Sequence, residues 1–347
     1  MKPRHARKLI YSSVFIAAFP AFGIVIPSSI TGVGQDYTAS DYLAPYGTVK
    51  DGVNLNGVVF INTGGVTCSG ALIGPTQVLT AAHCFSGASG VNTVVNFVDS
   101  TNSFDPISGR SVIDPDYTGV WSSGADLAIV NLASPAPSWS TVYQLFNGIY
   151  AYGSTIVVAG FGYTGTGDTG ETSYDQVRRV GENSYDTNGS VFGSADALQN
   201  VLVGDFDNGR SANNVLSTLT LGAGYTGVST PGLYDEVDIG HGDSGGPSFY
   251  NGMLIGIHDI IDCETPKNGT TCLAPPSVNA SYGPNSYYGE LFGDTSVAGN
   301  AAWIDAETPE PSSWLLCLVA VPLIAIAQLN APFRKPSGRP SHNVVPG

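Results

Sequence analysis

Charged side chains are scarce in this 347-residue chain, and basic ones most of all. Only 12% of the residues are charged, with 13 Lys and Arg against 28 Asp and Glu, for a net charge of −15. Seven of the basic residues lie in 1–30 and 311–347, so the stretch 31–310 carries a net charge of −22. A surface this acidic repels nucleic acid and anionic lipid headgroups. We therefore expect no nucleic-acid partner, and membrane contact through the terminal segments only.

Long stretches with helical periodicity are absent as well. From residue 57 to residue 257, short apolar runs alternate with turns rich in Gly, Asn, Asp and Ser, which is typical of antiparallel strands. The 44 Gly and 17 Tyr fit the same pattern. The sequence thus predicts an all-β fold with one short helix near 299–305, and elaborated surface loops within 160–240.

Cysteines are few, and no two have the Cys-x-x-Cys spacing of many zinc sites. Cys317 lies in a C-terminal apolar run, which leaves four for the body of the chain. Cys68 and Cys84 are sixteen positions apart, and a disulfide that closes such a loop stabilises a fold by about 3 kcal/mol. We expect disulfides between Cys68 and Cys84 and between Cys263 and Cys272, with zinc binding as the alternative. We predict no metal and no cofactor.

Both ends of the chain have the pattern of targeting segments. Residues 2–8 are basic and precede an apolar run from Leu9 to Ile26, which is the order of a secretory signal and predicts a signal peptide over 1–30. An uncleaved anchor is the alternative. At the other end, Pro309-Glu310-Pro311 precedes an apolar run over 314–329 and then three basic residues, which predicts a transmembrane helix.

The C-terminal segment, 307–347, resembles the PEP-CTERM sorting signal of Gram-negative bacteria that make exopolysaccharide. The resemblance implies an exported protein at the cell surface or outside the cell, anchored in the inner membrane by its C-terminal helix until a sorting protease removes that tail. A permanent C-terminal anchor is the alternative. The span is interrupted by Pro322, and the tail beyond Arg339 is longer than is usual for such signals.

Three segments carry the residue types of serine-based peptide hydrolysis, which needs a hydroxyl nucleophile, an imidazole base and a carboxylate that orients the base. His83 lies in Thr-Ala-Ala-His-Cys, Asp126 opens the apolar run Asp-Leu-Ala-Ile-Val, and Ser244 lies in Gly-Asp-Ser-Gly-Gly-Pro. Asp114 and Asp116 are rivals for the carboxylate, but neither opens such a run.

These segments, in the order His, Asp, Ser, closely resemble the chymotrypsin/trypsin family of serine proteases. The resemblance implies a trypsin-like domain over 31–306 with two antiparallel six-stranded β-barrels, at about 45–150 and 151–306. It implies a serine endopeptidase with a polypeptide substrate. His83, Asp126 and Ser244 would be catalytic, with the N–H groups of Gly242 and Ser244 as the oxyanion hole. The alternative is a catalytically silent, protease-like binding or surface-matrix protein, although no triad member is missing.

Two features depart from the family pattern. Family members are commonly activated by a cut that frees an apolar N-terminus to pair with the Asp before the nucleophile, here Asp243, yet no Lys or Arg followed by Ile-Val precedes Cys68. We expect that no cut after a basic residue is needed. In the substrate pocket, Asp238 resembles the anchor for Lys and Arg, whereas His258 resembles a wall residue of enzymes that cleave after acidic residues.

For this pocket we favour cleavage after Arg or Lys. The alternatives are a solvated loop carboxylate for Asp238 and a hydrogen-bonded strand residue for His258. Asp259, next along the chain, replaces the family's usual Ser.

Two further motifs are interpreted as turns. The run 160–165 has the glycine spacing of a dinucleotide-binding loop, but the residues after it cannot begin the helix that would bind pyrophosphate. The run 205–209 has two carboxylates at the spacing of a calcium loop, but its Gly is one position early and no Glu closes the loop.

Overall fold

A computed structural model describes residues 24–28, 39–208, 216, 236–262 and 285–308 of the chain. Met1–Ile304 forms one compact unit and Asp305–Gly347 a second, of which only 305–308 are described. The expected Cys263–Cys272 disulfide and the apolar run 314–329 therefore lie outside the described residues, as does most of the expected signal segment. Within the described ranges, no helix has the length and hydropathy needed to cross a bilayer.

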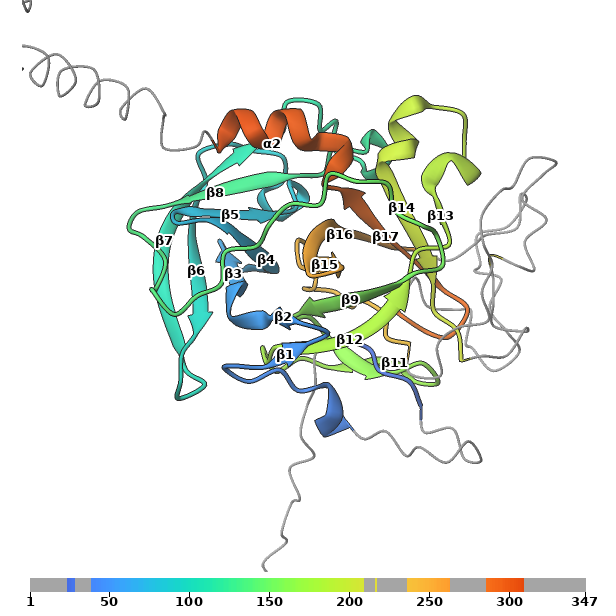
Figure 1. The fold of residues 1–347 in the computed structure, drawn as a ribbon, viewed down its shortest axis with the longest axis horizontal. Coiled ribbons are helices and arrows are strands. Elements are labelled where there is room, and N and C mark those ends of the chain that lie inside the picture. The colour runs from blue at the N-terminus through green and yellow to red at the C-terminus, as the bar shows by residue number, and fades with distance from the viewer. Residues whose placement is uncertain (1–23, 29–38, 209–215, 217–235, 263–284, 309–347) are drawn as a thin grey trace, which may run out of the picture. The chain divides into compact units, whose positions relative to one another are not determined.

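Six antiparallel strands close into a barrel, called here the first barrel, in the order β3-β4-β5-β8-β7-β6 (Figure 1). Each strand is rich in β-branched residues, which favour the extended backbone. Its members are β3 (Val58–Thr63), β4 (Val66–Gly74), β5 (Gln77–Thr80), β6 (Asn92–Val98), β7 (Phe104–Ile113) and β8 (Ala128–Leu132). The first predicted barrel is thus confirmed.

Seven strands form a second sheet beside the barrel, in the order β12-β9-β15-β16-β17-β14-β13 (Figure 1). They are β9 (Thr155–Gly160), β12 (Arg179–Ser184), β13 (Thr187–Asn188), β14 (Val201–Asp205), β15 (Pro247–Tyr250), β16 (Met253–Asp262) and β17 (Leu291–Ser296). In the part of the chain that is described, this sheet is a half-barrel and not the second closed six-stranded barrel that was predicted. Among these residues, the outer edge of β12 pairs locally with Leu43 and Glu236, and the short β13 pairs with β14, so the ladder does not close.

Two hairpins and several short helices complete the described structure. The hairpins pair β1 (Val49–Lys50) with β2 (Val53–Asn54) and β10 (Thr164–Thr166) with β11 (Gly170–Ser173). The 3-10 helices are η1 (Ala39–Tyr42), η2 (Leu55–Gly57), η3 (His83–Phe85), η4 (Trp121–Ser123), η5 (Gly189–Val191), η6 (Asp196–Asn200) and η7 (Ala298–Asn300). The α-helix α2 (Ala301–Glu307) follows η7 and confirms the short helix expected near 299–305.

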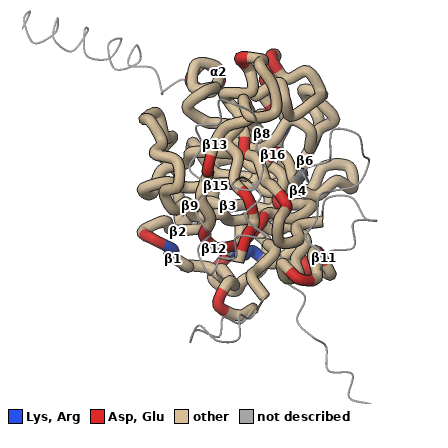
Figure 2. Tube along the Cα trace, turned by 90° about the vertical axis from the view of Figure 1, so that its right-hand side faces the viewer, with Lys and Arg blue, Asp and Glu red and all other residues tan. Residues whose placement is uncertain are grey.

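One apolar core runs from the first barrel into the second sheet. It joins barrel residues such as Phe60, Leu79 and Ile129 to sheet residues such as Phe249 and Ile257. Because the two halves bury their apolar faces against each other, they have a fixed relative position, and the loops at their junction are held on both sides. Charged residues are few on the described chain, and basic ones are the rarest (Figure 2).

Candidate active site

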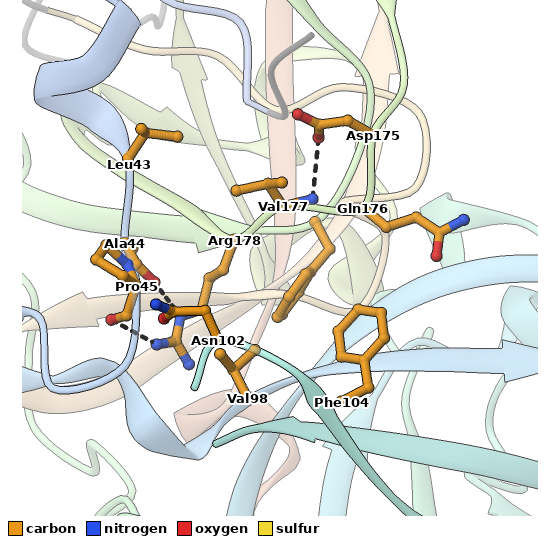
Figure 3. Close-up of a pocket in the computed structure, with 11 residues that line it drawn as sticks. Leu43, Ala44, Pro45, Val98, Asn102, Phe104, Asp175, Gln176, Val177 and Arg178 are labelled. Atoms are coloured by element: carbon orange, nitrogen blue, oxygen red, sulfur yellow. Dashed lines mark hydrogen bonds between the residues drawn. The ribbon is translucent and has the colours of Figure 1, made fainter. Parts of the chain in front are cut away.

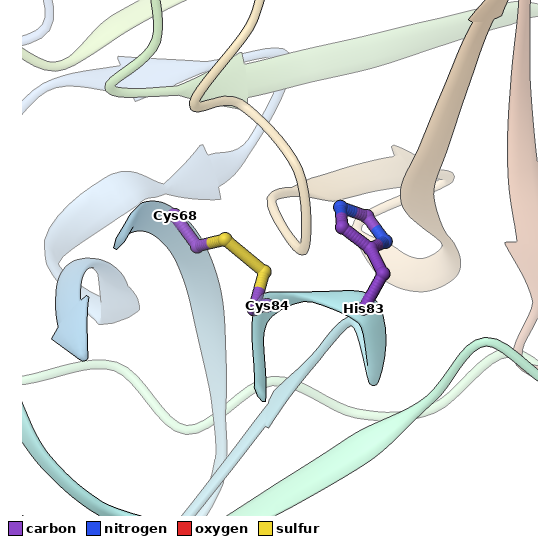
Figure 4. Close-up of side chains that lie close together, drawn as sticks. All are labelled: Cys68, His83 and Cys84. Atoms are coloured by element: carbon purple, nitrogen blue, oxygen red, sulfur yellow. A yellow bond between two sulfur atoms is a disulfide. The ribbon is translucent and has the colours of Figure 1, made fainter. Parts of the chain in front are cut away.

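His83 begins the short helix η3, directly after β5 of the first barrel. The next residue, Cys84, forms a disulfide with Cys68 on β4, as the sequence predicted. Figure 4 shows the disulfide and the imidazole side by side on this segment. Helix η3 ends at Ser86, whose φ of 52° and ψ of 32° are left-handed. The disulfide and this tight turn thus hold the backbone of His83 against the barrel.

Asp126 comes to His83 because of the register of two barrel strands. Thr80 on β5 pairs with Ala128 on β8, and the strands are antiparallel, so the residue three after Thr80 and the residue two before Ala128 leave the barrel at the same end. The Asp126 carboxylate accepts hydrogen bonds from the His83 backbone N–H (2.8 Å) and from Nδ1 of the ring (2.6 Å). The structure therefore pairs His83 with Asp126, not with the rivals Asp114 and Asp116.

The Asp126 side chain is only 2% exposed. Burial alone would raise its pKa, but the hydrogen bond and the charge of His83 outweigh burial and hold the pKa below its ordinary value. The carboxylate is therefore ionised at neutral pH. An ionised carboxylate only accepts hydrogen bonds, so Nδ1 of His83 must carry the ring proton that points at it, and Nε2 is left to act as a base.

Ser244 lies in the turn that precedes β15, and this turn rests on the first barrel. The backbone N–H of Ser69 donates to the carbonyl of Ser244 at 2.8 Å, and the Ser69 hydroxyl donates to the carbonyl of Gly242 at 3.0 Å. Ser69 is the neighbour of Cys68, whose disulfide holds η3. The nucleophile candidate from the second sheet and the base candidate from the first barrel are therefore anchored to the same few residues of β4.

The glycines of this turn are required by space and by backbone conformation. A Cβ on Gly245 would lie 2.0 Å from Oγ1 of Thr80 and 2.6 Å from the carbonyl oxygen of Ser69, and its φ is +79°. Gly242 has a φ of +93°. Side chains other than glycine would be strained at both positions, which accounts for the Gly-Asp-Ser-Gly sequence.

Along the turn, backbone N–H groups that donate a hydrogen bond alternate with N–H groups that do not. Those of Asp243 and Gly245 donate to the carbonyls of Gly240 and His258, at 2.9 and 2.7 Å. Within the part of the chain that is described, the N–H groups of Gly242 and Ser244 make no hydrogen bond. A pair of unused amides beside a serine hydroxyl can receive a developing oxyanion.

Comparison with known proteins agrees with this geometry. The family model described as Trypsin matches residues 52–214, a range that contains His83 and Asp126. Residues 52–214 are therefore similar to the trypsin-like serine proteases, and this match supports a serine-type endopeptidase activity for the chain. Among solved structures, it is similar to neuropsin, a serine protease expressed in the limbic system of mouse brain. The identity is 17% and the TM-score is 0.52, over 76% of this chain and 98% of that one, which supports the trypsin-like fold.

Asp243, next to Ser244 in this trypsin-like domain, is buried. Its hydrogen bonds fix the conformation of the turn that contains Ser244. Its carboxylate accepts from the N–H groups of Gly162 (2.7 Å) and Gly240 (2.8 Å). Burial raises its pKa to about 6, against these two hydrogen bonds, which lower it. A Cβ on Gly160 or Gly162 would lie within 2.6 Å of atoms of Asp243. The sequence identified residues 160–165 correctly as a turn, but gave no sign that its glycines make room for this carboxylate.

Residues 24–26 form part of the trypsin-like core, which sequence reasoning missed because it assigned them to the signal segment. Ile24 and Val25 are fully buried, and Ile26 is nearly so. Val25 exchanges two backbone hydrogen bonds with Asp238, at 3.0 and 2.9 Å, and Thr164 donates its hydroxyl to the carbonyl of Ile24. The apolar run that indicated a signal thus continues into a packed strand-like segment.

Asp238, the predicted substrate anchor, is 1% exposed. Its Oδ1 accepts from the N–H of Ile239 at 2.8 Å, and its Oδ2 has no hydrogen-bond partner within the described residues. Burial, and then the charge of Glu290, raise its pKa well above the ordinary range. The alternative of a solvated loop carboxylate does not fit this burial. The unused oxygen of this buried acid can take part in one further hydrogen bond.

His258, the other predicted pocket residue, is fully buried and faces inward. Its Nδ1 lies 3.0 Å from Oδ1 of Asp294, whose Oδ2 accepts from the Ser248 hydroxyl at 2.6 Å and from the Tyr185 hydroxyl. Burial lowers the pKa of His258, but the charge and hydrogen bond of Asp294 and the charge of Asp243 together outweigh burial and raise the pKa. This geometry fits the alternative of a hydrogen-bonded strand residue better than contact with a substrate, because the imidazole is fully buried and its Nδ1 is paired with Asp294, although its Nε2 has no partner among the described residues.

Among the described residues, possible metal ligands come together at two places. At each place, members of the set are already bonded to one another. The sulfurs of Cys68 and Cys84 are bonded together, beside His83. The second set is His83, Asp126 and Asp259, whose ligand atoms lie within 4.8 Å of one another, with His83 and Asp126 joined by a hydrogen bond. Inserting a cation would require these bonds to break.

An apolar pocket of about 370 Å³ lies away from these residues (Figure 3). It is lined by Phe104, Phe161 and Val177 among others, and by the side chain of Arg178. The Arg178 guanidinium donates to backbone carbonyls in the segment 44–58, including that of Ala44 at 2.8 Å. Burial lowers the pKa of Arg178 to about 10. The arginine thus joins the segment to the sheet, and none of His83, Asp126 and Ser244 lines this pocket.

Proposed function

We propose that the chain hydrolyses peptide bonds by acyl transfer, with Ser244 as nucleophile, His83 as general base and acid, and Asp126 as the group that orients His83. The observation that carries the proposal is the bond of 2.6 Å between His83 and Asp126, next to a glycine-shaped turn that presents a serine and two unused amides. These are the parts that serine acyl transfer needs.

In the first step, Nε2 of His83 takes the proton of the Ser244 hydroxyl as Oγ forms a bond to the scissile carbonyl carbon. The negative charge on the carbonyl oxygen is received by the N–H groups of Gly242 and Ser244. The imidazolium, stabilised by Asp126, then gives its proton to the leaving amine as the carbon–nitrogen bond breaks. Water deacylates the ester in the same way, giving its proton to His83, which returns it to Ser244.

We infer a preference for cleavage after Arg or Lys from Asp238. Its position six residues before Ser244, its burial and its unpartnered oxygen support a site for a substrate cation. An arriving guanidinium or ammonium would favour the ionised form of this carboxylate and pair with it. The inward orientation of His258 supports the same preference, because it leaves no described cation to receive an acidic side chain at that position.

We propose that the chain is exported by its N-terminal segment, and that the segment is cut before Ile24. Residues 24–26 are buried and bonded to Asp238, so a cut at the predicted boundary after residue 30 would remove packed structure. Mass spectrometry of the secreted protein should find a first residue at or before Ile24; a start at residue 31 would contradict this. The sorting of the C-terminal segment, 307–347, stays a proposal from sequence alone.

Hydrolysis of a peptide library tests the function. Wild-type protein should cleave it, with products that end in Arg or Lys, and Ser244→Ala should lose at least about 10⁴-fold in kcat/KM. Ser248→Ala is a matched control, because Ser248 is buried in another network. No cleavage of any peptide by folded wild-type protein would instead support the silent binding or matrix protein.

A further inference from the structure

Asp259 reaches the active site from a β-bulge. It lies on β16 (Met253–Asp262), where the residues on either side of it pair with two consecutive residues of β17 (Leu291–Ser296), so Asp259 is the extra residue. Such a bulge re-aims a side chain. Carboxyl oxygens of Asp259 and Asp126 lie within 4.8 Å of each other, and the interaction of the two groups lowers the pKa of Asp126 and raises that of Asp259, as expected of a carboxyl pair that shares one proton. The Oδ2 of Asp259 also accepts from the hydroxyl of Thr295 at 3.0 Å.

A hydrogen bond between two carboxyl groups requires one proton. An ionised carboxylate only accepts, so Asp126 and Asp259 cannot be bonded to each other with both groups charged. Two adjacent carboxylates, of which Asp126 is buried and Asp259 half-buried, would in addition repel each other, which favours one shared proton in such pairs.

The hydrogen-bond partners decide which carboxyl keeps the proton. Asp126 accepts from two N–H groups of His83, one of them on a ring that becomes positively charged during catalysis. Among the described residues, the donor to Asp259 is the Thr295 hydroxyl. In agreement, burial and then the charge of Asp126 raise the pKa of Asp259 well above its ordinary range, whereas the pKa of Asp126 is lowered.

Among the described residues, no other group that acts on the pair supplies a compensating cation. Asp294, which also acts on Asp259, is an acid already bonded to His258. Tyr117 faces both carboxyls; burial and their charges raise its pKa to about 12, so it is neutral through the working pH range. The proton between Asp126 and Asp259 is therefore the main means of reducing the negative charge at this point.

We propose that Asp259 is a positioning residue for catalysis: a neutral carboxylic acid that donates its proton to the Asp126 carboxylate and holds it toward His83. This inference rests on the proposed function. Asp126 then has three donors and carries the single negative charge that the imidazolium needs. When Asp259 loses its proton at alkaline pH, a second charge lies beside Asp126. The two carboxylates then repel each other, the bond that holds Asp126 toward His83 is lost, and activity falls.

Three variants test the donor by the pH profile of kcat/KM. Asp259→Asn keeps an N–H donor that does not titrate, and should stay within about threefold of wild type at pH 7 while its activity extends to higher pH. Asp259→Ala has no donor and should lose about tenfold at pH 7. Asp105→Asn makes the same chemical change at an exposed position and should follow wild type. Equal loss in the Asn and Ala variants, with an unchanged alkaline limb, would overturn the proposal.

A second measurement does not depend on activity. Because folding holds a proton on Asp259, wild type should lose thermal stability relative to Asp259→Asn as pH rises from 4 to 8, with no such trend for Asp105→Asn. A Tm difference that does not change with pH would overturn the proposal even if peptides are cleaved. If the trend is present but no peptide is cleaved and Ser244 does not react, the proposed function fails, and with it the catalytic role of this proton.

Discussion

The first barrel and the second sheet bury different kinds of side chain. In the barrel, the acidic residues that are buried among those described are Asp114 and Asp126. The second sheet and its loops bury eight: Asp186, Asp205, Asp207, Glu236, Asp238, Asp243, Glu290 and Asp294. Burial disfavours the charged form of an acid, and most of these groups with a resolved shift have raised pKa values, for example Asp238 and Glu290.

Because of this difference, the first barrel and the second sheet contribute different parts of the site. The barrel gives His83 and Asp126 a frame of apolar strands and one disulfide, which does not depend on pH. The second sheet supplies the nucleophile turn, the candidate substrate anchor Asp238 and the donor Asp259, all of them close to buried carboxyls. We therefore expect changes in the barrel to alter chemistry or global stability, and changes in the sheet to alter specificity and pH dependence.

The largest effect is expected in the barrel, from Asp126→Asn. An amide in this place would favour the wrong tautomer of His83 and could not stabilise the imidazolium. We expect kcat/KM to fall by about 10⁴-fold at pH 7, with an unchanged Tm to within a few degrees. Steady-state kinetics with the best library peptide measures this. Asp116→Asn, in an exposed part of the same barrel, is the control. A loss below tenfold would contradict the role given to Asp126.

A smaller and selective effect is expected in the sheet, from Asp238→Ser. Removing one partner of a buried charge pair costs roughly 2–5 kcal/mol, so kcat/KM for peptides with Arg or Lys before the cut should fall by about 100-fold. Peptides with an uncharged residue there should be affected much less, because the triad is untouched. Matched peptide pairs separate the two outcomes. An equal loss on both kinds of peptide would mean that Asp238 acts on the fold, not on the substrate.

Stability of the barrel is tested by removing its disulfide with Cys68→Ser and Cys84→Ser together. The loop between these residues spans sixteen positions, so its closure contributes about 3 kcal/mol to the free energy of unfolding. For a body of this size, the Tm should fall by about 6–12 °C. Calorimetry at pH 7 measures the shift. If the Tm stays within a degree of wild type, the disulfide does not hold η3 as described.

The smallest effect is a pH dependence in the sheet, from Glu290. Burial raises its pKa to about 7, and the N–H groups of Asn285 and Ser286 oppose this rise. An acid with a raised pKa stabilises the fold below its ordinary pKa, and this contribution is lost as pH rises toward 7. Between pH 5 and pH 7, wild type should lose about 2 kcal/mol relative to Glu290→Gln. Urea titrations at the two pH values measure the difference, and a constant difference would refute it.

The sequence predicts the parts of the site that depend on neighbouring residues, but not the parts that depend on contacts between residues far apart in the chain. The surroundings of His83, Asp126 and Ser244 are short motifs in which neighbours set the backbone, so each could be recognised alone, as could the Cys68–Cys84 pair. The open second sheet depends on how β12 meets Leu43 and Glu236, far along the chain. The inward turn of His258 depends on Asp294. No periodicity or motif in the sequence predicts these contacts.

The central claim is that Ser244 is the nucleophile and that His83 activates it. The most direct measurement is labelling of the purified protein with a fluorophosphonate, followed by mass spectrometry of its peptides. The account predicts one adduct, on Ser244, that is absent from Ser244→Ala and forms at least about 10³-fold more slowly in His83→Ala. Folded wild-type protein that gains no adduct, or that gains one on another residue, would contradict it.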